Sequence, residues 1–159
     1  MYYSLIGRDI ERDLVPLTER YGIGITVWSP LASGFLSGKY VRGAAAHPDN
    51  RLSAIDFIPF DKEKAFDLID ELRSIADGIG ASVAQVALAW LLAKRAVSSV
   101  VVGASKPSQL ADNLGAIDVS LDSAMMDRLD ALTRPIETYP HWHWRQFADA
   151  ATRDALALS

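Results

Sequence analysis

Two short apolar runs constrain the fold of this sequence more than any other feature. Residues 25–28 (ITVW) and residues 97–102 (VSSVVV) each end at a loop rich in glycine and serine. Short, nearly continuous apolar runs are typical of strands buried on both faces of a parallel sheet. Because helical patterns separate and follow the two runs, the order of elements predicts right-handed strand–helix–strand crossovers and an α/β fold.

Hydrophobic periodicity predicts several helices around these strands. The expected helices are one opened by Asp9 and carrying Ile10, Leu14, Leu17 and Tyr21, then residues 62–77, residues 83–94 with Ser82 as N-cap, one opened by Ser105 or Ser108, and one opened by Asp122. A third strand is expected over residues 2–5, and an irregular aromatic tail over residues 135–159. Since two or three parallel strands do not close a sheet, we interpret the sequence as part of an α/β barrel or a doubly wound fold.

Composition limits the classes of partner and compartment. Half of the 159 residues are apolar, which suffices for a core, and we expect residues 1–159 to form a single partial domain. The net charge of −4 and the lack of a Lys/Arg run argue against a nucleic-acid partner. The sequence has no cysteine, which excludes disulfides and thiolate sites. With neither a leader pattern nor a window of about eighteen apolar residues, we expect a cytoplasmic protein without a membrane partner.

The loop after the first run is a candidate site. Residues 29–61 show no sustained period, and a loop longer than about 15 residues in a compact domain is usually functional or disordered. Trp28 stands where the strand meets the loop. Its side chain belongs either to the core or to a flat surface on which an aromatic ligand stacks.

The loop after the second run, GASKPSQLADN, suggests phosphate binding. Gly103 and Ser105 allow a ligand to approach the backbone closely, and the following helix turns its free N–H groups toward the same point. Lys106 adds a positive charge, while Gln109 and Asn113 share one helix face. The alternative is an ordinary helix start after a strand, with both amides in solvent.

Other catalytic and metal motifs are absent from the sequence. His141 and His143 lie two residues apart without a third ligand at a recognisable spacing, so we expect no metal site. Neither a G-x-S-x-G elbow nor a Walker A loop is present.

Four segments, taken in order, resemble the aldo-keto reductases, especially the branch that includes the potassium-channel β subunits. They are YYSLIGRDIERDLVPL, GITVWSPLASGFLSGKY, VVGASKPSQLADNL and YPHWHWRQ. The resemblance implies a (β/α)8 TIM barrel, of which this sequence would form the C-terminal portion, about strands 6 to 8 with their helices. It further implies an NADP(H)-dependent oxidoreductase that transfers a hydride to a small carbonyl substrate in the full-length enzyme.

The resemblance assigns roles to residues of both loops. Trp28 matches an aromatic ring that stacks on the nicotinamide. The residues that match the loop wrapping the cofactor pyrophosphate, within residues 29–61, are Ser29, Pro30, Leu31, Ser33, Gly34, Leu36 and Lys39. Those that match the segment holding the adenosine end and the 2′-phosphate are Gly103, Ser105, Gln109, Asp112 and Asn113. Arg51 matches a loop arginine near that phosphate.

The family's catalytic residues fall outside this sequence. The resemblance places the tetrad of Asp, Tyr, Lys and His on the first four strands, ahead of Met1, so we assign no catalytic residue and expect the 159-residue chain alone to be inactive. Two alternatives stay open: a non-catalytic nucleotide-binding or regulatory module, and a half-barrel that covers its open edges by forming a homo-oligomer or by pairing with an N-terminal half.

Overall fold

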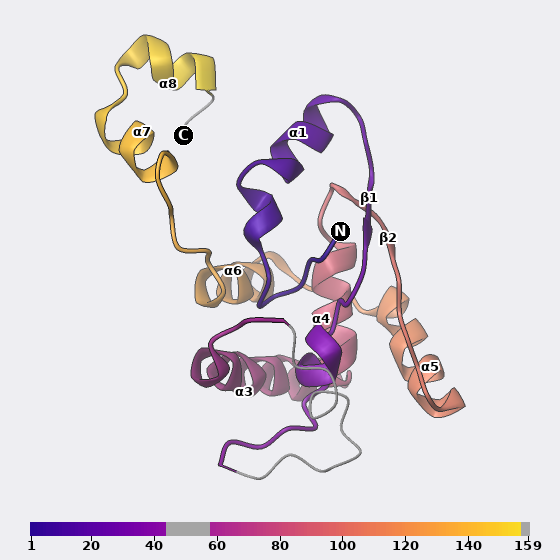
Figure 1. The fold of residues 1–159 in the computed structure, drawn as a ribbon. Helices are drawn as coiled ribbons and strands as arrows, with labels where there is room; N and C mark the ends of the chain where they lie inside the picture. The colour runs from indigo at the N-terminus through magenta and orange to yellow at the C-terminus, as the bar shows by residue number, and fades with distance from the viewer. Residues whose placement is uncertain (44–57, 157–159) are drawn as a thin grey trace.

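The structure, a computed structural model, describes residues 1–43 and 58–156. Along the described chain the elements are the 3-10 helix η1 (Asp9–Glu11), α1 (Leu14–Arg20), β1 (Ile25–Val27), the 3-10 helix η2 (Ala32–Ser37), α3 (Lys62–Ile79), α4 (Val83–Leu92), β2 (Val97–Val100), α5 (Pro107–Leu114), the 3-10 helix η3 (Gly115–Asp118), α6 (Ser123–Leu132), α7 (His141–Phe147) and α8 (Ala150–Leu156). Figure 1 shows α4 at the centre, with the strands on one side of it and α3 and α6 on another.

The two strands pair in parallel, as the sequence predicts. Ile25 lies opposite Val97 and Val27 opposite Val100, with a shift of register after Ile25. The third strand expected over residues 2–5 is wrong as a regular element. That segment instead forms isolated bridges, a parallel one between Tyr2 and Trp28 and an antiparallel one between Ser4 and Gly7.

Helix α4 carries much of the core. Its side chains are apolar nearly all round, and Val86, Trp90 and Leu91 have no exposed surface. Helices α3 and α4 meet at 93°, and both contribute to one apolar cluster with the N-terminal segment and η2. Within the described residues no single helix is long and apolar enough to cross a membrane, although α3 and α4 together have the necessary length and composition.

Two predicted N-caps are confirmed. Ser82 accepts a hydrogen bond from the Gln85 amide, while the Gln85 side chain accepts one from the Ser82 amide, which completes a capping box. Asp122 caps α6 through the Met125 amide. These caps fix the residues at which α4 and α6 begin.

One other predicted helix start is wrong. Asp9 lies in η1, where its carboxylate accepts a hydrogen bond from Arg12, and α1 begins only at Leu14. Helix α5 begins at Pro107, between Ser105 and Ser108, but neither serine caps it: the N-cap is Lys106, and proline suits the first helical position.

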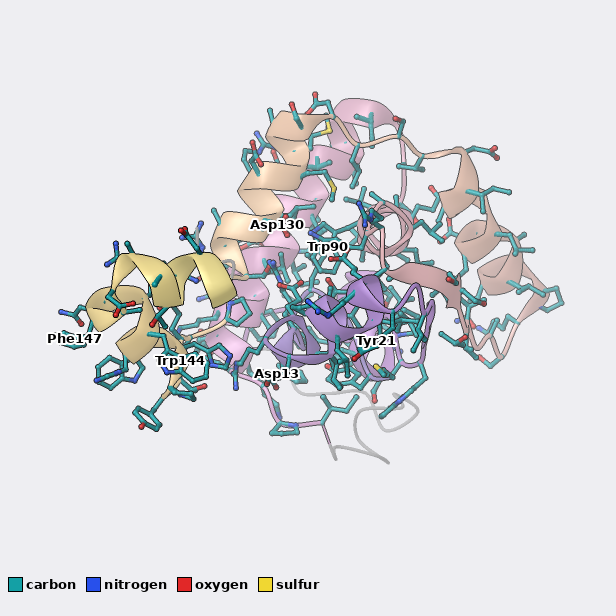
Figure 2. The ribbon with its side chains drawn as sticks, turned by 90° about the horizontal axis from the view of Figure 1, so that it is seen from above. Asp13, Tyr21, Trp90, Asp130, Trp144 and Phe147 are labelled. Atoms are coloured by element: carbon teal, nitrogen blue, oxygen red, sulfur yellow. The ribbon has the colours of Figure 1, made fainter. Side chains whose placement is uncertain are left out.

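Apolar side chains remain exposed on several helices of the described chain. Leu17 on α1 and the neighbouring Tyr21 are exposed, as are Leu114 on α5 and Ile117 on η3. The face predicted from Leu14, Leu17 and Tyr21 is therefore exposed in this structure, and α1 instead faces the core with Val15 and Thr18. The tail is not irregular, since it contains α7 and α8, and Figure 2 shows these helices, with Trp144 and Phe147, at one end of the molecule.

Candidate functional site

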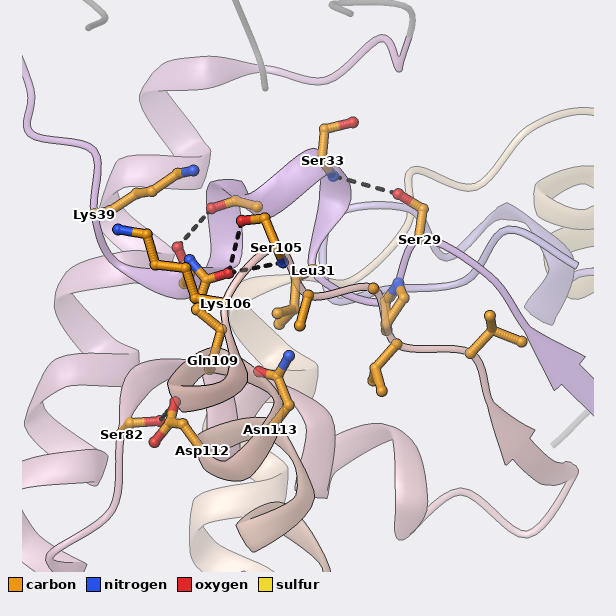
Figure 3. A pocket seen from close by; sticks show the side chains of 18 of the residues that line it. Ser29, Leu31, Ser33, Lys39, Ser82, Ser105, Lys106, Gln109, Asp112 and Asn113 are labelled. Carbon is orange, nitrogen blue, oxygen red and sulfur yellow. Dashed lines mark hydrogen bonds between the residues drawn. The ribbon is translucent and has the colours of Figure 1, made fainter. Parts of the chain in front are cut away.

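A pocket of about 1170 Å³ lies at the carboxyl ends of both strands. It gathers residues from the two loops that the sequence singles out, although these loops lie far apart in the chain (Figure 3). Twelve of the predicted site residues line it: Trp28, Ser29, Pro30, Leu31, Ser33, Gly34, Lys39, Gly103, Ser105, Gln109, Asp112 and Asn113. The carboxyl ends of parallel strands are where α/β proteins bind ligands.

The first wall of the pocket is a strained turn after β1. Among the described residues, the non-glycine positions with positive φ are Ser29, Ala32 and Ser33, with φ values of 52°, 46° and 56°. The left-handed region costs a residue with a β-carbon about 1–2 kcal/mol. Strain of this kind clusters at ligand sites, and here the strained residues lie in the loop that forms this wall.

Backbone amides of this turn are already bonded within the loop. The Ala32 amide donates to the Ser29 carbonyl at 2.9 Å, the Gly34 amide donates to the Leu31 carbonyl at 2.9 Å, and the Ser33 amide donates to Ser29 Oγ at 3.3 Å. Phosphate contacts from this wall would therefore come from side chains, namely the serine hydroxyls and the Lys39 ammonium, rather than from these amides.

The second wall is the start of α5. The side-chain oxygen of Gln109 accepts hydrogen bonds from the Ser105 amide at 3.1 Å and from Ser105 Oγ at 3.0 Å. This places the Gln109 side chain beside the loop and leaves its NH2 group as a donor. Asn113, one turn further along α5, is buried and lines the same pocket.

Asp112 is fixed from outside α5. Its carboxylate accepts a hydrogen bond from Ser82 Oγ at 2.9 Å, and its backbone carbonyl accepts one from Gln85 Nε2 at 2.9 Å. Ser82 and Gln85 are the residues that form the capping box of α4. The N-terminus of α4 therefore holds the pocket face of α5 in place.

Trp28 is not a core residue, so the interpretation of its side chain as part of the core is wrong. It retains 43% of its surface and lines the pocket. Exposure at the end of β1 leaves part of the indole available to a ligand, which agrees with the stacking interpretation.

The charges of the lining favour an anionic ligand. Lys39 and Lys106 contribute two positive charges, and Asp112 contributes one negative charge. Figure 3 shows both lysine side chains at the end of the pocket where Ser105 and Gln109 lie.

Among the described residues, one predicted site residue does not line the pocket. Leu36 has no exposed surface and packs in the core. Arg51 lies outside the described residues. Among the described residues no group of three potential ligands could hold a metal ion.

The structure adds lining residues that were not among the assigned positions. The sequence predicts a positive charge at Lys106 and a helix cap at Ser82, and the structure shows that both residues also line the pocket. The predicted cap gives no sign of the contact of Ser82 with Asp112, which links positions thirty residues apart. Hydrophobic periodicity within the segment of Ser82 or within that of Asp112 does not indicate a contact between the two segments.

Comparison with known proteins places the chain in a family. Residues 1–134 match the aldo/keto reductase family. The chain is 36% identical over 139 residues to a probable voltage-gated potassium channel subunit beta of Oryza sativa subsp. japonica, an alignment that covers 83% of this chain and 42% of that protein. It is also 36% identical over 135 residues to a probable voltage-gated potassium channel subunit beta of Arabidopsis thaliana, covering 80% and 41%.

A fungal relative extends this similarity. The chain is 39% identical over 124 residues to a putative voltage-gated potassium channel subunit beta of Schizosaccharomyces pombe, covering 73% of this chain and 35% of that protein. The chain thus spans well under half the length of these curated relatives. Because the family match covers most of the sequence, the chain belongs to the aldo/keto reductase family.

Proposed function

We propose that residues 1–159 form the C-terminal portion of an aldo-keto reductase barrel, about strands 6 to 8, and that its pocket binds NADP(H). The observation that carries this proposal is the single pocket in which the residues after β1 meet those of α5. Family membership supports it, because the resemblance assigned the same two segments to the cofactor. In this proposal residues 29–61 wrap the cofactor, and residues 135–159 form the tail that walls the substrate pocket.

The residues present fit the chemistry of such a cofactor. The exposed indole of Trp28 suits the flat nicotinamide ring. Lys39 and the serine hydroxyls of the first wall suit the pyrophosphate, and Lys106 suits the 2′-phosphate. The Gln109 and Asn113 side chains offer amide donors and acceptors to the adenosine end. When bound, the nicotinamide supplies or accepts a hydride.

Reduction of a small carbonyl substrate is proposed for the complete enzyme only. The Asp, Tyr, Lys and His tetrad that the resemblance requires has no match in residues 1–159, so this chain by itself would bind the cofactor without turnover. A non-catalytic regulatory module is the second candidate. It is supported by the relatives' names, which describe subunits of potassium channels.

The exposed apolar faces support a covering partner. Tyr21, at the C-terminal end of α1, retains 67% of its surface, and Ile117 on η3 retains 74%. We propose that an N-terminal half of the barrel or a second copy of the chain covers such surfaces, in a cytoplasmic assembly. Light scattering of the purified chain should then give a mass above that of one chain, and a monodisperse monomer would contradict this part of the proposal.

Fluorescence titration with NADPH tests the proposed site. NADPH accepts excitation energy from a nearby tryptophan, so the emission of Trp28 should fall and that of the nicotinamide should rise as NADPH is added. Trp28→Phe should remove most of this transfer, whereas Trp142→Phe in the tail should retain it. Binding without oxidation of NADPH by a test aldehyde supports the inactive half-site; turnover by the chain alone would contradict it, and absence of binding would overturn the cofactor assignment.

A further inference from the structure

The ring of Tyr2 packs directly against the indole of Trp28. Their centroids lie 5.3 Å apart and their planes are inclined at 41°. The backbone supports this contact, because the two residues form a parallel bridge and the Trp28 amide donates to the Met1 carbonyl at 2.9 Å. An aromatic pair in this range contributes stability beyond the burial of its area.

Tyr2 is itself held on its other side. A β-carbon at position 7 would overlap the Tyr2 ring, so the glycine there lets the chain pass close against it. Ser4 Oγ donates a hydrogen bond to the Tyr2 hydroxyl at 3.1 Å. Burial raises the pKa of Tyr2, in keeping with a neutral ring packed inside the protein.

Tyr2 does not line the pocket, whereas Trp28 does. Tyr2 therefore contacts the indole from outside the pocket, and any effect that it has on a ligand passes through Trp28. The contact with Tyr2 therefore limits the side-chain torsions of an indole that keeps 43% of its surface exposed.

We propose that Tyr2 is a positioning residue of the site, which packs against Trp28 and fixes the orientation in which the indole meets a ring in the pocket. The inference rests on the proposed function, since it assumes that the nicotinamide end of NADP(H) stacks on Trp28. Pre-organising one indole orientation lowers the entropic cost of binding the ring. Loss of Tyr2 should therefore weaken ligands that carry the nicotinamide and spare those that carry only the adenosine end.

Two ligands and two variants separate these effects. NADPH carries both ends of the cofactor, and 2′,5′-ADP carries only the adenosine end with its 2′-phosphate. Tyr2→Leu removes the ring and keeps an apolar side chain, whereas Tyr2→Phe keeps the ring. The chain is labelled with 5-fluorotryptophan, its four tryptophans are followed by ¹⁹F NMR, and the Trp28 resonance is assigned with Trp28→Phe. Circular dichroism checks that each variant is folded.

The expected result is selective. In Tyr2→Leu the Trp28 resonance moves while those of the other three tryptophans stay, and the dissociation constant for NADPH rises about three- to tenfold. The dissociation constant of Tyr2→Leu for 2′,5′-ADP stays within about twofold of that of the unsubstituted chain. Tyr2→Phe binds NADPH with the dissociation constant of the unsubstituted chain. An unmoved Trp28 resonance, or equal weakening of both ligands, would overturn the role of Tyr2 alone. Failure of the unsubstituted chain to bind either ligand would instead overturn the proposed function, and this role with it.

Discussion

The indole nitrogen of Trp90 donates a hydrogen bond of 3.0 Å to the carboxylate of Asp130 (Figure 2). This bond joins α4, the most buried helix, to α6. The same carboxylate lies 2.8 Å from Lys94 Nζ and 3.1 Å from an Arg8 guanidinium nitrogen. Asp130 thus connects the N-terminal segment, α4 and α6, and satisfies a polar group of a side chain that has no exposed surface.

Asp130→Ala should lower the free energy of unfolding by about 2–3 kcal/mol. The substitution leaves the buried Trp90 N–H without an acceptor and removes the shared partner of two cations, and an unsatisfied buried donor costs about 1–3 kcal/mol by itself. Urea unfolding followed by circular dichroism measures the change. The matched control is Asp127→Ala on the exposed side of α6, expected within about 0.5 kcal/mol of the parent. Equal effects of the two substitutions would contradict the network.

Ser33→Gly and Ser74→Gly should change stability in opposite directions. Ser33 has a φ of 56°, where glycine avoids a β-carbon clash, so its replacement should stabilise the chain by about 0.5–1 kcal/mol. Ser74 is exposed within α3, where glycine costs about 1 kcal/mol. Melting temperatures of the two variants give the comparison. Destabilisation by Ser33→Gly would show that the turn is not strained in solution.

Alkaline pH should destabilise the protein through Tyr3. Burial, and then a hydrogen bond donated to Glu11, raise the pKa of Tyr3 above its ordinary value of 10.0. Above about pH 10 the unfolded chain releases this proton while the native chain retains it, so stability falls by up to about 1.4 kcal/mol per pH unit from this group. Below pH 10 both states hold the proton, and the contribution is constant.

Tyr3→Phe isolates that contribution. At pH 8 it should cost about 1 kcal/mol, because the hydrogen bond to Glu11 is lost while Arg8 still pairs with that carboxylate. Between pH 10 and 11 its unfolding free energy should fall less steeply than that of the parent. Parallel slopes in urea titrations at these pH values would contradict the raised pKa.

Lys106→Ala should weaken the binding of 2′,5′-ADP, and Lys39→Ala should weaken the binding of NADP(H). Loss of one charge-assisted phosphate contact corresponds to about a five- to tenfold rise in the dissociation constant. The difference from the parent should shrink as salt is raised, because salt screens exposed charges. Lys64→Ala on α3, outside the pocket lining, is the control for net charge. An equal effect of Lys64→Ala would show that the pocket lysines act only through overall charge.

Features that depend on neighbouring residues were predictable from the sequence. Ser82 and Asp122 cap their helices through amides three residues ahead, and the short runs beginning at Ile25 and Val97 form the parallel pair. Asp9 is a residue type that is favoured at helix N-caps, but its carboxylate pairs with Arg12 in a separate 3-10 turn. Neither η1 nor α1 has a side-chain cap, so an acidic residue ahead of an apolar period does not by itself predict one.

Features that depend on tertiary packing were not predictable in this way. Trp28 is bridged and packed by Tyr2 from the N-terminal segment, and Asp112 is held by Ser82 thirty residues away. Leu36 belongs to the loop assigned to the cofactor, yet the fold turns it into the core. The loop has no hydrophobic period from which its inward residues could be identified.

Mapping of NADP⁺ binding by ¹H–¹⁵N NMR tests whether this pocket holds the cofactor. If it does, NADP⁺ should cause saturable shifts of backbone amides in the two segments that line the pocket, residues 28–39 and residues 103–113, with smaller changes elsewhere. 2′,5′-ADP should reproduce the shifts of residues 103–113 alone. The absence of shifts at millimolar NADP⁺, or shifts confined to the small cleft beside Glu19 and Arg95, would contradict the assignment of this pocket to the cofactor.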